Sequence, residues 1–128
     1  MQRLANCDIT IDIEVIEDIS GSNQYFEIFF STPKKERYKL IFDGVWDMRY
    51  SIEATAVDRF CEFRECLPTG LIDNNVYIVE NSEYIKYFER QVAGLLPVDE
   101  LTHYIVDDRT DTILDILTDR HKPVLIPL

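Results

Sequence analysis

The sequence predicts an α+β fold, in which two to three helices pack on an antiparallel sheet built from an N-terminal four-strand meander and further short strands. Residues 46–53 alternate large apolar and polar side chains through eight positions without an exception, and side chains alternate faces along a strand. Residues 7–16 alternate almost as regularly. In the second half of the chain, apolar residues recur at helical spacings of three and four. The length of 128 residues fits a single domain, residues 1–128, with a proper core.

Four strands are expected in the first half of the chain. Their ranges are residues 7–16, 24–31, 36–42 and 46–53. Asp43–Gly44, just before the last of them, is a hairpin signal. The last strand is expected to direct four side chains into the core: Trp46, Met48, Tyr50 and Ile52.

Residues 24–31 are apolar on both faces, because Tyr25 and Phe29 lie opposite the face that carries Phe26 and Phe30. A strand of this kind is either covered by a helix on its second face or exposes an apolar patch there.

The second half is predicted to mix helices with short strands. Residues 55–67 have helical periodicity, and a second helix begins at an N-cap, Asn81 or Ser82, and ends at Gly94. Residues 110–118 are interpreted as a third helix, although alternate positions there also suit a strand. The short strands are residues 76–79, 101–106 and 124–126.

The chain is acidic, with 24 acids against 13 bases and a net charge of −11. This charge disfavours nucleic acid and anionic membranes as partners, because both attract basic surfaces. A basic protein partner would be attracted, although an acidic surface also serves solubility alone. The basic residues of the second hairpin interrupt this pattern: Lys34, Lys35, Arg37 and Lys39.

The cysteines and the hydropathy pattern predict a cytoplasmic protein. Cys7, Cys61 and Cys66 are odd in number, which favours reduced thiols. The first residues lack the apolar run of a signal peptide, and no window approaches the eighteen apolar residues of a membrane span.

No recognisable catalytic, metal or cofactor motif occurs in the sequence. The cysteine and histidine spacings match no zinc signature, and the four glycines form no phosphate-binding loop. His103 is expected to be a structural histidine partly buried at a sheet edge, and His121 to be exposed. A pairing of Cys61 or Cys66 with His103 would need a tertiary contact. The sequence therefore predicts no catalytic residue, no metal and no cofactor.

Residues 76–85, residues 103–106, the acidic segment 110–118 and the Pro-containing strand at the end resemble small uncharacterised bacterial proteins. Some of these are similar to the immunity partners encoded beside polymorphic toxins. The resemblance covers about the last 55 residues. It implies an acidic, cytoplasmic, non-catalytic protein that binds one partner.

The leading functional hypothesis is a non-catalytic interaction protein, of the inhibitor or immunity type, that binds one macromolecular partner through an acidic surface. The alternatives are a small-ligand-binding protein with an aromatic-lined pocket between sheet and helices, and a small enzyme with an unrecognised site. An unpaired edge strand would also allow a homodimer. The predicted partner-binding residues are Asp8, Asp12, Glu14, Tyr25, Phe29, Asp47, Arg49 and Glu53.

Overall fold

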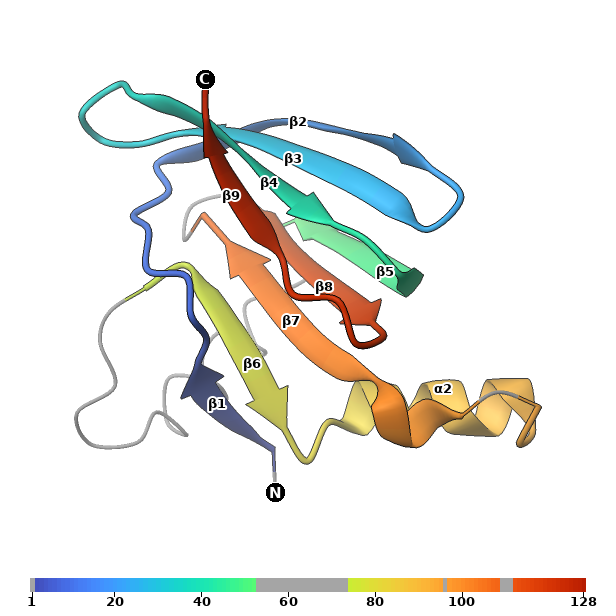
Figure 1. The fold of residues 1–128 in the computed structure, drawn as a ribbon. Helices are drawn as coiled ribbons and strands as arrows, with labels where there is room; N and C mark the ends of the chain where they lie inside the picture. Colours follow the sequence, from blue (N-terminus) through green and yellow to red (C-terminus); the bar gives the residue numbers. More distant parts are fainter. Residues whose placement is uncertain (1, 53–73, 96, 109–111) are drawn as a thin grey trace.

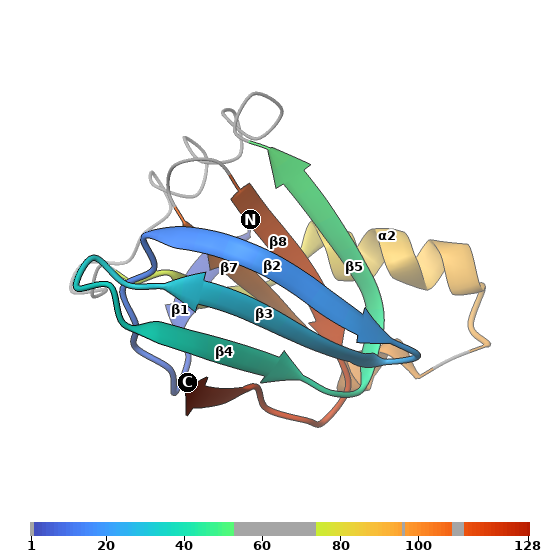
Figure 2. The same cartoon turned by 90° about the horizontal axis from the view of Figure 1, so that it is seen from above.

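Two antiparallel sheets lie face to face in the computed structural model (Figures 1 and 2), which describes the chain except for residues 1, 53–73, 96 and 109–111. The strand order is β1-β6-β7-β8-β5 in the five-stranded sheet and β2-β3-β4-β9 in the four-stranded sheet. The α-helix α2 (Glu83–Val92) and the 3-10 turn η1 (Val98–Glu100) pack on the outer side of the five-stranded sheet. The strands are β1 (Arg3–Asn6), β2 (Val15–Ser22), β3 (Tyr25–Ser31), β4 (Arg37–Phe42), β5 (Val45–Ile52), β6 (Val76–Glu80), β7 (Thr102–Asp107), β8 (Thr112–Thr118) and β9 (Val124–Pro127).

The main core lies between the two sheets. Phe30 and Leu40 enter it from the four-stranded sheet, and Val106, Leu114 and Ile116 enter it from the five-stranded sheet. All five side chains are fully buried. Because burial of apolar surface is the main favourable term in folding, this interlayer core holds the two sheets together.

The predicted four-strand meander is wrong in two respects. Only β2, β3 and β4 form a meander, and β5 crosses into the other sheet, where it pairs with β8. Residues 7–14 are not a strand but an extended segment that links β1 to β2; it is called the connector below. Its alternation is nevertheless real, because Ile13 is buried in the core while Asp12 is exposed.

Two buried asparagines hold the connector in place. The side-chain oxygen of Asn74 accepts a hydrogen bond from Ile11 N at 3.0 Å, and its Nδ2 donates to Ile9 O at 2.8 Å. Asn75 Oδ1 accepts from Ile13 N at 3.0 Å. Side chains therefore satisfy backbone groups that a neighbouring strand would satisfy in a sheet.

The prediction that Trp46 shares a face with Met48 is also wrong. The register between β5 and β8 shifts between Val45 and Asp47, which is typical of a β-bulge. The extra residue reverses the alternation, so Trp46 packs beside α2 while Met48 packs on the interlayer core. Further along β5, Tyr50 is 59% exposed rather than buried, and Ile52 is also exposed.

In the second half, the expected strands correspond to β6, β7 and β9, and the expected capped helix is α2. The interpretation of residues 110–118 as a helix is wrong, because Thr112–Thr118 forms β8. Every residue of β8 is buried, and an apolar run buried on both faces imitates a buried helix. The described residues contain one α-helix rather than two or three, and residues 55–67 lie outside them. Among the described residues, no helix has the length and apolarity that crossing a membrane requires.

Candidate functional site

The predicted acids Asp8, Asp12 and Glu14 are exposed on the connector. Two of them form salt bridges at the surface: Lys122 Nζ lies 3.0 Å from Asp8, and Lys35 Nζ lies 2.8 Å from Glu14. Asp12 forms no salt bridge with the described residues. Lys35 of the second hairpin and Lys122, which precedes β9, thus neutralise part of the acidic surface, and exposed ion pairs of this kind add little stability.

The predicted aromatic residues Tyr25 and Phe29 lie on the outer face of the four-stranded sheet. They alternate with the core residues Ile28 and Phe30, so they point away from the core. No described helix or strand covers this face, since α2 lies on the other sheet (Figures 1 and 2). The sequence left two expectations for the second face of β3, namely cover by a helix or an exposed apolar patch. The described residues support the exposed patch.

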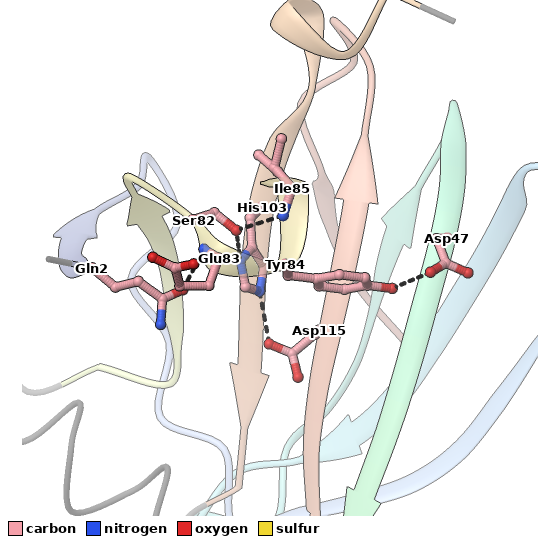
Figure 3. Close-up of polar contacts among 8 residues, drawn as sticks. All are labelled: Gln2, Asp47, Ser82, Glu83, Tyr84, Ile85, His103 and Asp115. Atoms are coloured by element: carbon pink, nitrogen blue, oxygen red, sulfur yellow. Dashed lines mark hydrogen bonds and ion pairs between the residues drawn. The ribbon is translucent and has the colours of Figure 1, made fainter. Parts of the chain in front are cut away.

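Asp47 and Arg49 lie elsewhere, beside α2 on the outer face of β5. Tyr84 OH donates a hydrogen bond to Asp47 Oδ2 at 2.6 Å (Figure 3). The Arg49 guanidinium stands 3.8 Å from the centroid of the Tyr84 ring and 5.1 Å from that of Tyr87, within cation–π range. Burial, followed by the hydrogen bond to Asp47, raises the pKa of Tyr84 above its usual range, so its hydroxyl stays protonated.

The seven predicted binding residues that the structure describes therefore lie in three places, namely the connector, the outer face of β3 and the outer face of β5. β5 is the edge of the five-stranded sheet opposite β1, and Asp47 and Arg49 lie on its outer face beside α2 rather than on the connector. Glu53 lies outside the described residues.

A chain of three buried polar residues, Ser82, His103 and Asp115, joins α2 to the centre of the five-stranded sheet (Figure 3). Ser82 Oγ lies 2.7 Å from His103 Nδ1, and His103 Nε2 lies 2.7 Å from Asp115 Oδ1. The three residues are at most 5% exposed. His103 is thus structural as expected, but it lies on the central strand β7 and not at a sheet edge.

One distribution of protons that satisfies the hydrogen bonds of this trio has a neutral His103. Ser82 is the N-cap of α2, and its Oγ accepts from Ile85 N at 3.0 Å. With the Ser82 hydroxyl donating to Nδ1, the remaining ring proton of a neutral His103 lies on Nε2 and is donated to Asp115. In the strand register, Arg49 lies directly opposite Asp115, which places a positive charge beside the buried carboxylate.

Hydroxyl, imidazole and carboxylate are also the groups of a nucleophilic triad. Here the hydroxyl is buried and caps a helix, and the next backbone amide, Glu83 N, donates to Gln2 Oε1 at 2.8 Å (Figure 3). The Tyr84 ring also packs against the imidazole in a T-shaped contact, with centroids 5.2 Å apart. The trio therefore ties α2, β7 and β8 together instead of presenting a nucleophile to a substrate.

A cavity of about 150 Å³ lies between the sheets, on the inner side of β6 and β7. It is lined mainly by the connector, the two strands and the segment before β9: Cys7, Ile9, Ile78, Tyr104, Lys122 and Pro123. The cavity is thus a partly open pocket, bounded by sheet and connector and not, as expected for a ligand pocket, by sheet and helices. Burial raises the pKa of the Cys7 thiol, which stays protonated, and Cys7 Sγ lies 3.4 Å from Ile9 O in hydrogen-bonding geometry.

Within the described part of the chain, no group of three or more His, Cys, Asp or Glu side chains has the geometry to hold a metal ion. Cys61 and Cys66 lie outside it. Sequence reasoning missed the roles of Asn74, Asn75 and Asp115. Only Asp115 left a signal in the sequence, because it is the single acid within the apolar run of residues 112–118.

The fold and these sites define a two-layered antiparallel protein, with one sheet face packed against a helix and the opposite outer face left uncovered by any described element. No family model, curated protein or solved structure matches the chain. The function is therefore inferred from this geometry.

Proposed function

We propose that this chain is a non-catalytic interaction protein that binds one protein partner through the outer face of its four-stranded sheet. The observation that carries the proposal is the group of apolar side chains on that uncovered face. It is called the outer patch and comprises Tyr25, Phe29, Ile41, Val124 and Ile126.

The strand register brings the outer patch together. Phe29 lies opposite Lys39, which lies opposite Ile126, and the neighbouring row runs from Glu27 through Ile41 to Val124. In the middle, Lys39 Nζ pairs with Glu27 Oε1 at 3.1 Å, and both side chains are less than a quarter exposed. Apolar side chains around a partly desolvated polar pair resemble the composition of a protein interface.

The charge of the neighbouring segments favours a basic partner. Residues 4–33 contain six acids and no lysine or arginine. Most of these acids lie on the connector and on β2, the strand next to β3, where Asp12 and Asp18 are exposed. Acids beside an apolar patch would steer a basic protein toward it and raise the association rate.

Within this class, the specific proposal is an inhibitor of the immunity type. The resemblance of residues 76–85 and 103–106 to immunity partners of toxins supports it, as does the net charge of −11. A soluble, acidic inhibitor of this kind would bind a single basic toxin in the cytoplasm and block its surface.

The experiment begins with affinity capture of the partner from the native cell and calorimetric titration of the purified partner. We expect Phe29→Thr to weaken binding at least about tenfold, because central aromatic residues dominate interface energies. Threonine keeps the strand preference of the site. Tyr50→Thr is the matched control, since Tyr50 is 59% exposed on the other sheet. Equal affinities for the two variants would contradict the outer patch as the interface.

A second experiment tests whether the acidic residues of the connector contribute to binding independently of the outer patch. Changing Asp8, Asp12 and Glu14 to lysine should slow association with a basic partner and reduce its salt dependence, while the dissociation rate changes little. Rate constants from surface plasmon resonance at two salt concentrations measure this. An unchanged association rate in the triple variant would eliminate the acidic connector from recognition.

A further inference from the structure

We propose that the cavity between the connector and strands β6 and β7 is a binding site for a small, neutral aromatic molecule with one hydroxyl group, of the size of phenol. This site is separate from the outer patch. The cavity lies between the sheets, whereas the outer patch faces away from them.

The size and the walls of the cavity define the body of the ligand. Ile9, Ile78 and Pro123 contribute aliphatic walls, and Tyr104 contributes its ring. The volume is about 150 Å³, and an apolar cavity of about that volume in another protein accepts benzene. One six-membered ring therefore matches this volume.

The Tyr104 hydroxyl defines the polar group of the ligand. Tyr104 is 5% exposed, and its ring is fixed by an edge-to-face contact with Phe42 at 5.5 Å. Its hydroxyl has no hydrogen-bond partner among the described residues, although Cys7 and Asp8 are close enough to contribute, after burial, to the raised pKa of Tyr104. Among the described residues no buried side-chain oxygen lacks a hydrogen-bond partner, so the Tyr104 hydroxyl is reached by solvent from the cavity. A ligand hydroxyl can therefore take the place of water as its hydrogen-bond partner.

The charges at the rim favour a neutral ligand. Asp8 and Lys122 line the cavity, are mostly exposed, and neutralise each other at 3.0 Å. A charged ligand would lose hydration on entry without meeting an uncompensated opposite charge. The Cys7 thiol is already directed at Ile9 O and Val76 O, so Tyr104 remains the polar group that is available to the ligand.

The test is a titration of the full isotopically labelled chain with phenol, followed by amide NMR shifts. We expect saturable shifts centred on Ile9, Ile78 and Lys122, with a dissociation constant on the order of 1 mM, as suits a ligand of this size. Toluene, which matches the ring and lacks the hydroxyl, should bind about five to ten times more weakly.

Two variants test the walls and the hydroxyl separately. Tyr104→Phe keeps the ring, and we expect it to reduce phenol affinity about five- to tenfold while toluene affinity stays unchanged. Ile78→Phe fills the cavity and should abolish binding of both molecules. Absence of saturable shifts with phenol in the wild-type chain would overturn the site. An unchanged phenol affinity in Tyr104→Phe would overturn the role of the hydroxyl.

Discussion

Replacing Asn75 with alanine should destabilise the protein more than its small change in volume suggests. Asn75 is 1% exposed, and its side chain bonds to two backbone groups of other segments, Ile13 N–H at 3.0 Å and Asp107 C=O. The Asn75→Ala variant removes both bonds at once. The loss of a partner costs about 2 kcal/mol for the buried Ile13 amide and about 1 kcal/mol for the carbonyl of Asp107. We therefore expect the free energy of unfolding to fall by about 3 kcal/mol.

Urea unfolding followed by the fluorescence of Trp46 measures this change. Trp46 is the only tryptophan, and its ring packs on Phe88 at a centroid distance of 6.3 Å, so unfolding exposes it. With a slope of about 2 kcal/mol per molar urea, the midpoint should fall by about 1.5 M.

The matched control is Asn6→Ala, which removes an exposed asparagine from β1 and should cost less than about 0.5 kcal/mol. If Asn75→Ala lowers the free energy of unfolding by no more than Asn6→Ala does, Asn75 does not hold the connector. The reasoning from its two hydrogen bonds would then be refuted.

Three further predictions concern the buried trio and the turns. Asp115→Leu removes the acceptor of His103 Nε2 and should cost about 3 kcal/mol. Adding His103→Leu should recover part of this loss, and a double-mutant cycle without coupling would contradict the pairing. Gly44→Ala should cost about 2 kcal/mol, because Gly44 has φ 62° and an added Cβ would collide with Asp119; an unchanged urea midpoint would exclude that collision. The hydrogen bond to Asp119 raises the pKa of His121 in the folded protein. Protonated His121 therefore stabilises the folded state below the unfolded pKa of about 6.5, and this contribution is lost as the pH rises through the pKa of the folded state. Urea midpoints between pH 5 and pH 9 should show this loss in the wild type, and a His121→Gln variant with the same profile would count against it.

Local patterns in the sequence were sufficient to find most of the elements. Ser82 was one of two predicted N-caps for α2, and β6, β7 and β9 were recognised from short apolar runs. These features depend on residues that are neighbours in sequence, such as a serine three residues before the amide that it caps. The exposure of Asp12 followed from alternation in the same way.

The arrangement of the strands depends on contacts that local patterns do not contain. β5 has a clear strand pattern, but its pairing with β8 joins segments about 65 residues apart. A single bulge reversed the direction of Trp46, and burial on both faces gave β8 a helix-like composition. Strand period alone specifies neither a bulge nor a pairing partner.

The candidate sites were even less accessible to sequence reasoning. The Tyr104 cavity and the trio of Ser82, His103 and Asp115 each combine residues from separate segments. Their individual residue types are common, and only their convergence in space gives them a role. Two of the five residues of the outer patch, Tyr25 and Phe29, were predicted, because β3 is apolar on both faces.

Along the connector, residues that hold the fold alternate with exposed residues that are proposed to steer a partner. Asn74 and Asn75 hold its backbone, and Ile9 and Ile13 anchor it in the core. The alternate positions 8, 10, 12 and 14 face solvent, so their charge can change at little cost to stability. A lineage could therefore reverse or redistribute the connector's charge to follow a changing partner while the fold beneath stays the same. We expect sequence divergence among relatives to concentrate at these four positions and to spare the two asparagines.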